Sequence, residues 1–278
     1  MNANEMTYGV ELEVFVPATV QIQVGGYHNG MQVAGLPTGW NAQGDCSIQA
    51  DPGYRGVEIV SPVLRGADGL KQIQEVCCWL SSIGAKVNRS TGCHVHVGFA
   101  GNDTDLAVLT GLVAYHETAL FAVTGSKARM SSRYCKPIRT STEHQGVANK
   151  TLNGTRDRYH TLNLNNLTTC GRAPTVEFRM FAGTCNALKV IGYVRMCLAL
   201  VEKAHEMRRL PKWTPTENEK NMNRLGAHAV KRFFACFGWT KGKTPYVYGA
   251  VIDETLPTVE ACKTKLMEMA RKFDVVTE

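Results

Sequence analysis

An alternation of apolar and charged residues over 6–16 is the feature that most constrains how this chain can fold. Side chains point alternately to the two faces of a β-strand, so residues two apart share a face. One face would carry Val10, Leu12 and Val14, and the other would carry Glu11, Glu13 and Phe15. The segment therefore predicts a strand with two carboxylates that point the same way.

Three later segments repeat this arrangement. Residues 56–64, 93–99 and 175–181 are each predicted to be strands. They carry Glu58, then His94 with His96, and then Glu177 with Arg179. Unpaired charge is costly amid apolar sequence. The recurrence on four predicted strands therefore favours convergence of these side chains on one face of a sheet.

Each of these groups also has a purely structural interpretation. Glu11 and Glu13 could occupy a solvent-exposed strand face, and Glu177 with Arg179 could be a surface ion pair. Histidines on a strand can be hydrogen-bonded within a partly polar core. Only their combination favours a functional site, in which clustered carboxylates need cations to offset their repulsion. Oxygen ligands with few nitrogens suit magnesium or manganese better than zinc.

Apolar residues spaced three or four apart predict helices between and after these strands. We expect helices over 67–83, 104–123 and 187–209, with two further helical patterns around 221–237 and 258–273. Residues 125–157 are expected to form a long loop, and 159–167 a further strand. The loop gathers Arg129, Arg133, Lys136 and Arg139, which favours a local anion site.

Composition excludes several classes of protein. Of the 278 residues, 44% are hydrophobic and 20% charged, which is typical of a soluble globular protein. We expect a cytoplasmic protein without a membrane association, because the chain shows neither a signal-peptide pattern nor a long apolar run. The ten cysteines are scattered and are expected to be reduced. A net charge of +7 could reflect an anionic substrate, a nucleic acid or solubility alone.

Six ordered motifs together resemble the amidoligase family, whose members look like compact relatives of glutamine synthetase and glutamate–cysteine ligase. The motifs are YGVELEV, the Asp45–Ser47 pair followed by GVEIVSPVL, TGCHVHVG, SRYCKPI, RYHTLNLNNL and TVEFRMFAGT. The resemblance spans roughly residues 8–205. It implies an α+β fold with a glutamine synthetase-like catalytic domain at 1–210, in which helices cover the sheet face opposite the metals. Residues 211–278 would be a C-terminal helical extension packed on the same domain.

The resemblance also implies roles for particular residues. Glu11, Glu13, Glu58, His94 and Glu177 would bind two or three Mg²⁺ ions, with Mn²⁺ as an alternative, and these ions would clamp ATP. His96, Arg133, Lys136 and Arg179 would contact the phosphates and the transferring phosphoryl group as catalytic residues. Asp45, Arg158 and Asn163 would contact the nucleotide, the amine or the acid.

The implied reaction is ATP-dependent amide or isopeptide formation through an acyl phosphate, with small-molecule or peptide carboxylates and amines as substrates. Two rival functions remain open. A metal-dependent hydrolase also uses a His-x-His pair with carboxylates, although such sites usually recruit more histidines. A non-enzymatic nucleic-acid-binding protein would fit the basic charge, but only 8% of residues are aromatic and no basic–aromatic pattern indicates a stacking surface.

Overall fold

An antiparallel sheet of eight strands lies at the centre of the computed structural model, which describes residues 3, 5–168, 171, 173–207, 209, 226–240 and 255–275. The strand order is β2-β3-β4-β1-β6-β8-β7, with β5 paired to one end of β1. The strands are β1 Thr7–Pro17, β2 Met31–Gln32, β3 Asn41–Gln43, β4 Tyr54–Val60, β5 Leu64–Arg65, β6 Gly92–Gly98, β7 Leu162–Asn163 and β8 Thr175–Ala182. The mixed fold with an antiparallel sheet that the sequence predicts is thus observed.

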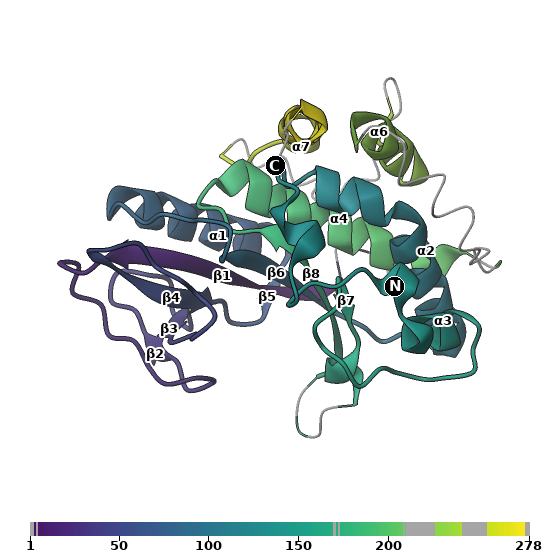
Figure 1. Ribbon diagram of the computed structural model, residues 1–278, viewed down its shortest axis with the longest axis horizontal. Coiled ribbons are helices and arrows are strands. Elements are labelled where there is room, and N and C mark those ends of the chain that lie inside the picture. The colour runs from purple at the N-terminus through teal and green to yellow at the C-terminus, as the bar shows by residue number, and fades with distance from the viewer. Residues whose placement is uncertain are drawn as a thin grey trace.

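Five of the six α-helices within the described residues cover one face of this sheet in two layers, and α3 packs on α2 beside them (Figure 1). In the inner layer α4 packs on β6, α2 packs on β8, and α1 lies beside α4. The outer helices α6 and α7 pack on α2 and α4, respectively. The bounds are α1 Gly66–Ser82, α2 Asp103–Ala122, α3 Thr142–Ala148, α4 Ala187–Glu206, α6 Gly226–Cys236 and α7 Val259–Val275.

The apolar phase of the strands explains why the helices lie on this face. Val10, Leu12 and Val14 are almost fully buried, as the alternation in β1 predicts. Phe181 of β8 stacks on Tyr193 of α4 with ring centroids 4.2 Å apart. The hydrophobic core therefore lies between the sheet and the helices, and the opposite face is left for polar side chains.

Local signals set the limits of several elements. Asn102 caps α2 by accepting hydrogen bonds from the backbone N–H groups of Thr104 and Asp105. The strand predicted over 56–64 ends at Val60 and resumes as β5, since Pro62 cannot donate a ladder hydrogen bond. The helix predicted over 187–209 ends at Glu206.

Two expectations for the middle of the chain are wrong in detail. Residues 125–157 are not a continuous loop, because they contain α3 and the 3₁₀ turns Ala128–Ser131 and Ile138–Thr140. The strand expected over 159–167 is only the two residues of β7. The Asn163 side chain accepts a hydrogen bond from the backbone of Asn165 at 2.9 Å, and this turn ends the strand.

A β-bulge interrupts the pairing of β6 with β8. Val95 lies opposite Phe178, but Cys93 lies opposite Phe181, so β8 carries one extra residue there. Arg179 and Met180 consequently share the place opposite His94. The bulge keeps Phe181 on the helix face, where strict alternation would have turned it toward the polar face.

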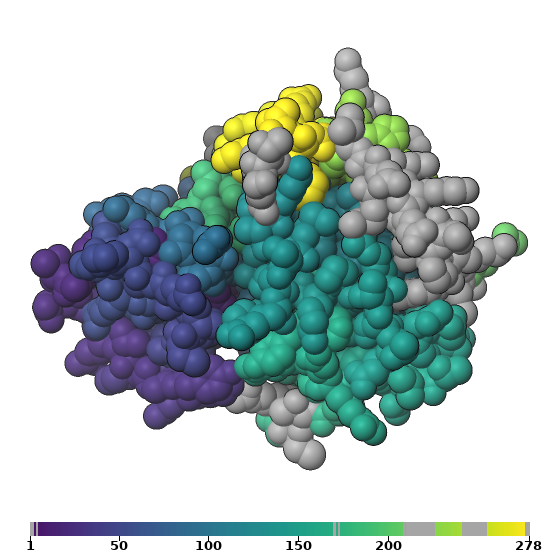
Figure 2. Space-filling view, in the orientation of Figure 1, coloured from purple at the N-terminus to yellow at the C-terminus, as the bar shows by residue number. Residues whose placement is uncertain are grey.

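The C-terminal helices α6 and α7 form the outer helical layer and pack on the inner helices. Figure 2 shows α7 in yellow against the teal and green segments that it covers, with the purple N-terminal strands at one end of this face. The helical pattern expected at 221–237 appears as α6, and its first five residues lie outside the described part of the chain. Across the described residues no helix combines the length and apolarity that a membrane crossing requires.

Candidate metal centre

The sheet face opposite the helices carries the acidic residues that the sequence singles out. Strand register brings them together: Glu13 of β1 lies directly opposite Glu58 of β4, and Glu11 lies opposite His94 of β6. One strand further along, His96 lies opposite Glu177 of β8. Four neighbouring strands therefore contribute one continuous cluster of carboxylates and imidazoles.

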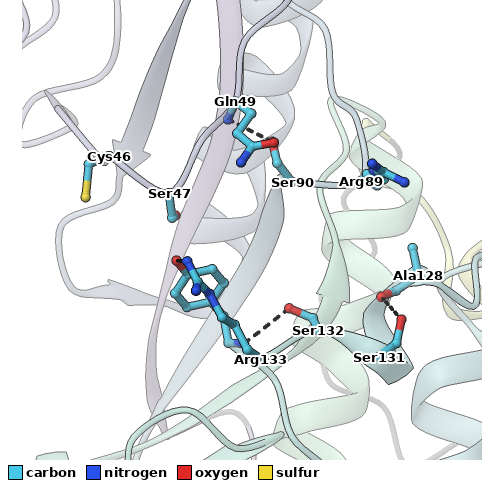
Figure 3. A pocket seen from close by; sticks show the side chains of 10 residues that line it. Cys46, Ser47, Gln49, Arg89, Ser90, Ala128, Ser131, Ser132 and Arg133 are labelled. Atoms are coloured by element: carbon cyan, nitrogen blue, oxygen red, sulfur yellow. Dashed lines mark hydrogen bonds between the residues drawn. The ribbon is translucent and has the colours of Figure 1, made fainter.

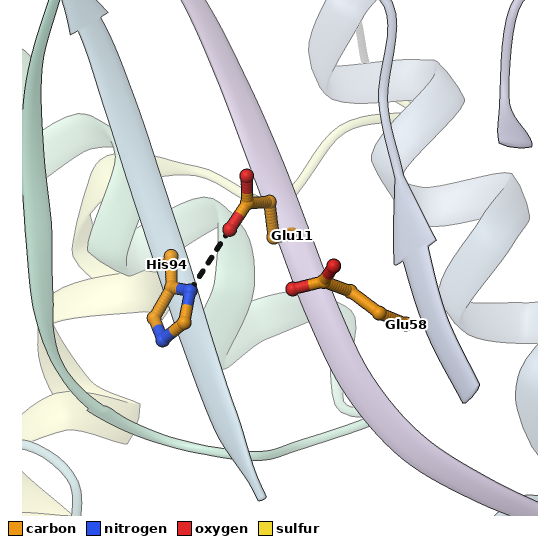
Figure 4. Close-up of side chains that lie close together, drawn as sticks. All are labelled: Glu11, Glu58 and His94. Carbon is orange, nitrogen blue, oxygen red and sulfur yellow. Dashed lines mark hydrogen bonds and ion pairs between the residues drawn. The ribbon is translucent and has the colours of Figure 1, made fainter. Parts of the chain in front are cut away.

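His94 lies at the centre of this cluster and is almost fully buried. Its Nδ1 is 2.9 Å from Glu11 Oε2 and 3.7 Å from Glu177 Oε1, and its Nε2 is 3.5 Å from Glu13 Oε1. Figure 4 shows Glu11, Glu58 and His94 pointing toward one another from three strands. One ligand atom from each lies within 4.8 Å of the other two, which is a spacing that one cation could bridge.

A second triad lies beside the first. It consists of Glu11, His96 and Glu177, and one ligand atom of each again lies within 4.8 Å of the others. His96 Nε2 is 3.1 Å from Glu11 Oε1 and 3.9 Å from Glu177 Oε1. The same nitrogen is buried and makes no aligned hydrogen bond with any described residue. Its contacts within the described chain are therefore ion pairs with Glu11 and Glu177.

A third group joins Glu13, Asp45 and Glu58 on the other side of β1. Glu13 Oε2 accepts a hydrogen bond from the backbone N–H of Gly92 at 2.5 Å. Glu58 Oε2 accepts one from Gln43 Nε2 at 2.5 Å. Each of these glutamates is thus oriented by one oxygen while the other oxygen remains available.

Burial and mutual repulsion disturb the ionisation of this cluster. Burial, together with the nearby Glu11 and Glu13 carboxylates, raises the pKa of Glu58 to about 8. Burial acts against ionisation of Glu11 as well, but the facing imidazoles of His96 and His94 hold its pKa well below the usual value. Despite its burial, His96 has a pKa raised to about 9 by Glu11 and Glu177. The carboxylates and imidazoles of the cluster therefore shift one another's ionisation strongly.

The donor set fits hard divalent cations. Glu11, Glu13, Glu58 and Glu177 supply carboxylate oxygens, and imidazole nitrogens are in the minority, as expected for Mg²⁺ or Mn²⁺. The raised pKa of Glu58 reflects burial beside other carboxylates, and a bound cation would favour its ionised form. A sheet stabilised only by its own side chains would gain nothing from this accumulation of carboxylates.

Two arginines border the cluster at the bulge. Arg179 Nη1 donates to Glu177 Oε1. Burial opposes the charge of both groups, but the Glu177 carboxylate raises the pKa of Arg179, and the Arg179 guanidinium lowers the pKa of Glu177. Asn163 Nδ2 donates to the other oxygen of Glu177 at 2.6 Å. The second arginine, Arg129, donates from Nη2 to the backbone oxygen of Arg179 at 2.7 Å.

Arg129 has a place in the site that its sequence neighbourhood did not reveal. Only 4% of the residue is exposed, and its Nε has no hydrogen-bond partner among the described residues. A Cβ added to Gly92 would lie 3.1 Å from both Arg129 Nη2 and His94 Nε2. The guanidinium therefore lies against the carboxylate–imidazole cluster, and the glycine leaves room for that approach.

A cavity of about 220 Å³ opens above the cluster. It is lined by Glu13, Asp45 and His94 together with Arg129 and Arg179. Aromatic and basic side chains form its rim: Tyr27, Tyr134, Arg158 and Tyr159. Arg158 Nη2 donates to the hydroxyl of Tyr27 at 2.6 Å, which links segments 131 residues apart. Arg158 thus lines this cavity, and its contact with a substrate or nucleotide stays a prediction.

Two expected phosphate contacts have other partners. Lys136 pairs with Asp157 on the surface, and no contact joins it to the carboxylate cluster within the described chain. The Arg133 guanidinium donates to the hydroxyl of Tyr134 at 2.7 Å and lies over its ring. It lines a second, larger cavity rather than the first. Their interaction with phosphates stays a prediction.

Comparison with known proteins agrees with this geometry. The family model described as "Putative amidoligase enzyme" matches residues 4–201, which include every strand of the sheet and most of α4. The chain belongs to this amidoligase family, and the class of protein is accordingly a ligase. No curated protein matches the chain.

Proposed function

We propose that the chain is an ATP- and Mg²⁺-dependent carboxylate–amine ligase that forms an amide or isopeptide bond through an acyl phosphate. The observation that carries this proposal is the convergence of four glutamates and two histidines on one sheet face, bordered by Arg129 and Arg179. Membership of the amidoligase family supports the same class of reaction. We further propose that residues 1–210 form a glutamine synthetase-like catalytic domain and that the protein acts in the cytoplasm.

The residues that would hold the cations are Glu11, Glu13, Glu58, His94 and Glu177, with Asp45 and His96 at the edges of the cluster. When bound, the cations would neutralise the phosphates of ATP and hold the γ-phosphate toward the acid. Gly92 and Gln43 keep Glu13 and Glu58 oriented by hydrogen bonds to one oxygen of each. This arrangement prepares the ligands before a cation arrives.

Fixed positive charge would act on the transferring phosphoryl group. Arg179 is held by Glu177, and its backbone oxygen is held by Arg129, so the two guanidinium groups are tied to the same bulge. Such preorganised charge stabilises the transition state most where water is excluded. The carboxylate oxygen of the acid would bond to the γ-phosphorus as the bond to ADP breaks.

The second half of the reaction needs an amine in its neutral form. Its nitrogen would attack the acyl carbon, inorganic phosphate would leave, and the amine would lose one proton. The rim residues Tyr27, Arg158 and Tyr159 would limit access of water to the activated acid. Exclusion of water matters because hydrolysis of an acyl phosphate would waste ATP.

Hydroxylamine trapping tests this function directly. The purified chain, ATP, Mg²⁺ and a panel of carboxylic acids are incubated with hydroxylamine, and hydroxamate and ADP are quantified together. We expect equal amounts of both for a competent acid, and no hydroxamate when EDTA is added. Cleavage of amide substrates without nucleotide, with no ADP from any acid, would instead establish a metal-dependent hydrolase.

A further inference from the structure

A second cavity of about 820 Å³ adjoins the smaller one above the carboxylate cluster. The two share the wall formed by Cys46, Ser47, Ser90 and Tyr134. Figure 3 shows side chains from three segments arranged around this space, with Arg89 and Arg133 on different sides of it. A volume of this size can hold a small-molecule ligand or a few residues of a peptide.

The larger cavity has the chemistry of an anion site. Two guanidinium groups line it, and its other polar groups are mainly hydroxyls and one thiol. None of the described lining residues is an aspartate or glutamate. Arg89 makes no hydrogen bond or ion pair with any described residue, so its charge is available to a ligand. The adjoining carboxylate cluster has the opposite character.

The walls of the cavity are held in place before a ligand binds. Asn88 Nδ2 donates to the backbone oxygen of Gln49 at 2.8 Å, and the Ser90 hydroxyl accepts from the Gln49 backbone N–H at 3.0 Å. These bonds tie the turn that carries Arg89 to the segment that carries Ser47. A preorganised wall lowers the entropy lost when a ligand is bound.

The three ligands required by the proposed ligase can be assigned by elimination. An amine substrate enters as a cation in water and would be repelled by Arg89 and Arg133. The phosphates of ATP must lie at the carboxylate cluster, where cations would bind them. The aromatic side chains Tyr27 and Tyr159, which are 53% and 37% exposed, offer a stacking surface for the base at the rim of the smaller cavity. The larger cavity is then left for the acid.

We infer that the larger cavity binds the body of the acid substrate and that Arg89 recognises a second anionic group on it, remote from the carboxylate that is activated. This inference rests on the proposed function. The substrate class is thus a dicarboxylate or a more acidic compound, including a peptide with a free carboxylate. A bidentate pair between a guanidinium and a carboxylate would give both affinity and orientation.

Cys46 provides a test of binding that does not depend on turnover. It lies in the wall shared by the two cavities and is exposed, whereas Cys78 on α1 is exposed on the helix side of the sheet. Alkylation by iodoacetamide is measured by peptide mass spectrometry at constant ionic strength, without nucleotide. The probes are glutarate and pimelate, with butyrate and hexanoate as their monocarboxylate counterparts.

We expect the dicarboxylates to slow alkylation of Cys46 at least tenfold, the monocarboxylates to have little effect, and Cys78 to react at one rate throughout. Arg89→Gln should lower the affinity for the protecting dicarboxylate about tenfold to a hundredfold. The control variant Arg271→Gln, which removes an exposed arginine from α7, should leave protection intact. Arg89→Lys should recover only part of the affinity, because an ammonium group cannot make the two parallel hydrogen bonds of a guanidinium.

Equal protection by monocarboxylates and dicarboxylates, or unchanged protection in Arg89→Gln, would overturn the inference. So would Arg89-dependent protection by Mg²⁺–ATP without any by dicarboxylates, since the cavity would then be the nucleotide site. The hydroxamate assay separates these outcomes from failure of the proposed function. ADP and hydroxamate from a monocarboxylate, together with no dicarboxylate protection, would leave the ligase intact and remove only this substrate assignment.

Discussion

Glu13 and Glu58 lie directly opposite each other across β1 and β4, with both side chains almost fully buried. Like charges opposed in this way destabilise a sheet. Glu13 accepts a hydrogen bond from Gly92, and Glu58 accepts one from Gln43. Among the described residues, the basic side chain that pairs with Glu13 is His94, and no basic side chain pairs with Glu58. The pair therefore links the stability of the sheet to pH and to bound cations.

The first prediction concerns pH. Burial raises the pKa of Glu58 from 4.5 to about 8, so the native state retains a proton that the unfolded state has released. Stability without metal must then fall as pH rises from 6.5 to 8, by about 1–2 kcal/mol from this group. His96, raised to about 9, acts in the same direction. Urea titrations in EDTA across this window measure the fall.

Substitution separates the contribution of Glu58 from the others. Glu58→Gln should flatten the pH dependence between 6.5 and 8 and raise stability at pH 8, whereas the exposed Glu75→Gln on α1 should do neither. Burial lowers the pKa values of His116 and His144 to about 4, so these residues oppose the fall near pH 6.5, where the unfolded state still protonates them, and Glu58→Gln leaves their contribution unchanged. An unchanged slope in Glu58→Gln would contradict the assignment.

The second prediction concerns cation binding. Glu11→Gln and Glu177→Gln each remove one ligand charge at nearly constant volume, and we expect at least a tenfold loss of Mn²⁺ affinity by electron paramagnetic resonance. Glu75→Gln is again the control. Glu11→Gln should retain the fold but lower the melting temperature in EDTA, because the ionised Glu11 is stabilised by the facing imidazoles of His96 and His94. Wild-type Mn²⁺ affinity in both variants would exclude this face as the cation site.

The third prediction separates phosphoryl transfer from cation binding. Arg179→Lys keeps the charge but loses the planar fork that donates to Glu177. We expect hydroxamate formation to fall about a hundredfold or more while Mn²⁺ affinity changes little. The matched control is Arg271→Lys on the surface of α7. If Arg179→Lys kept full hydroxamate formation, its proposed role would be lost.

The fourth prediction uses the glycine beside His94 and Arg129. Gly92→Ala places a methyl group 3.1 Å from nitrogens of both side chains, and they must move by a few tenths of an ångström. We expect weaker Mn²⁺ binding and a lower rate of hydroxamate formation with an unchanged circular dichroism spectrum. Gly154→Ala, where no atom lies within 4 Å, is the control. Equal behaviour of the two variants would contradict the close approach of Arg129.

The sequence predicts the strands of the site well because their polar and apolar residues alternate with a clear period. Glu11, Glu58, His94 and Glu177 could therefore be assigned to one sheet face without coordinates. The residues between 125 and 167 were harder to predict, because short turns stabilised by side-chain hydrogen bonds leave no periodic pattern.

Arg129 shows why part of the site could not be predicted. Nothing in its local sequence distinguishes it from Arg133 or Arg139, and only long-range packing directs it to the backbone oxygen of Arg179. Arg89 lies in a turn without a motif, and the cavity that it lines exists only after residues 46–49, 89–90 and 128–134 are brought together. Such a site depends on tertiary structure.

The bulge in β8 divides that strand into two segments whose side-chain orientations are set separately. Before it, Glu177 and Phe178 alternate between the carboxylate face and the helix face; after it, Phe181 has returned to the helices one residue later than strict alternation allows. Changes that repack Phe181 on Tyr193 therefore need not shift Glu177, and changes around Glu177 need not disturb the core beyond the bulge. Because of this one inserted residue, substitutions near Glu177 can change the carboxylate site while the packing of Phe181 on the helices stays the same.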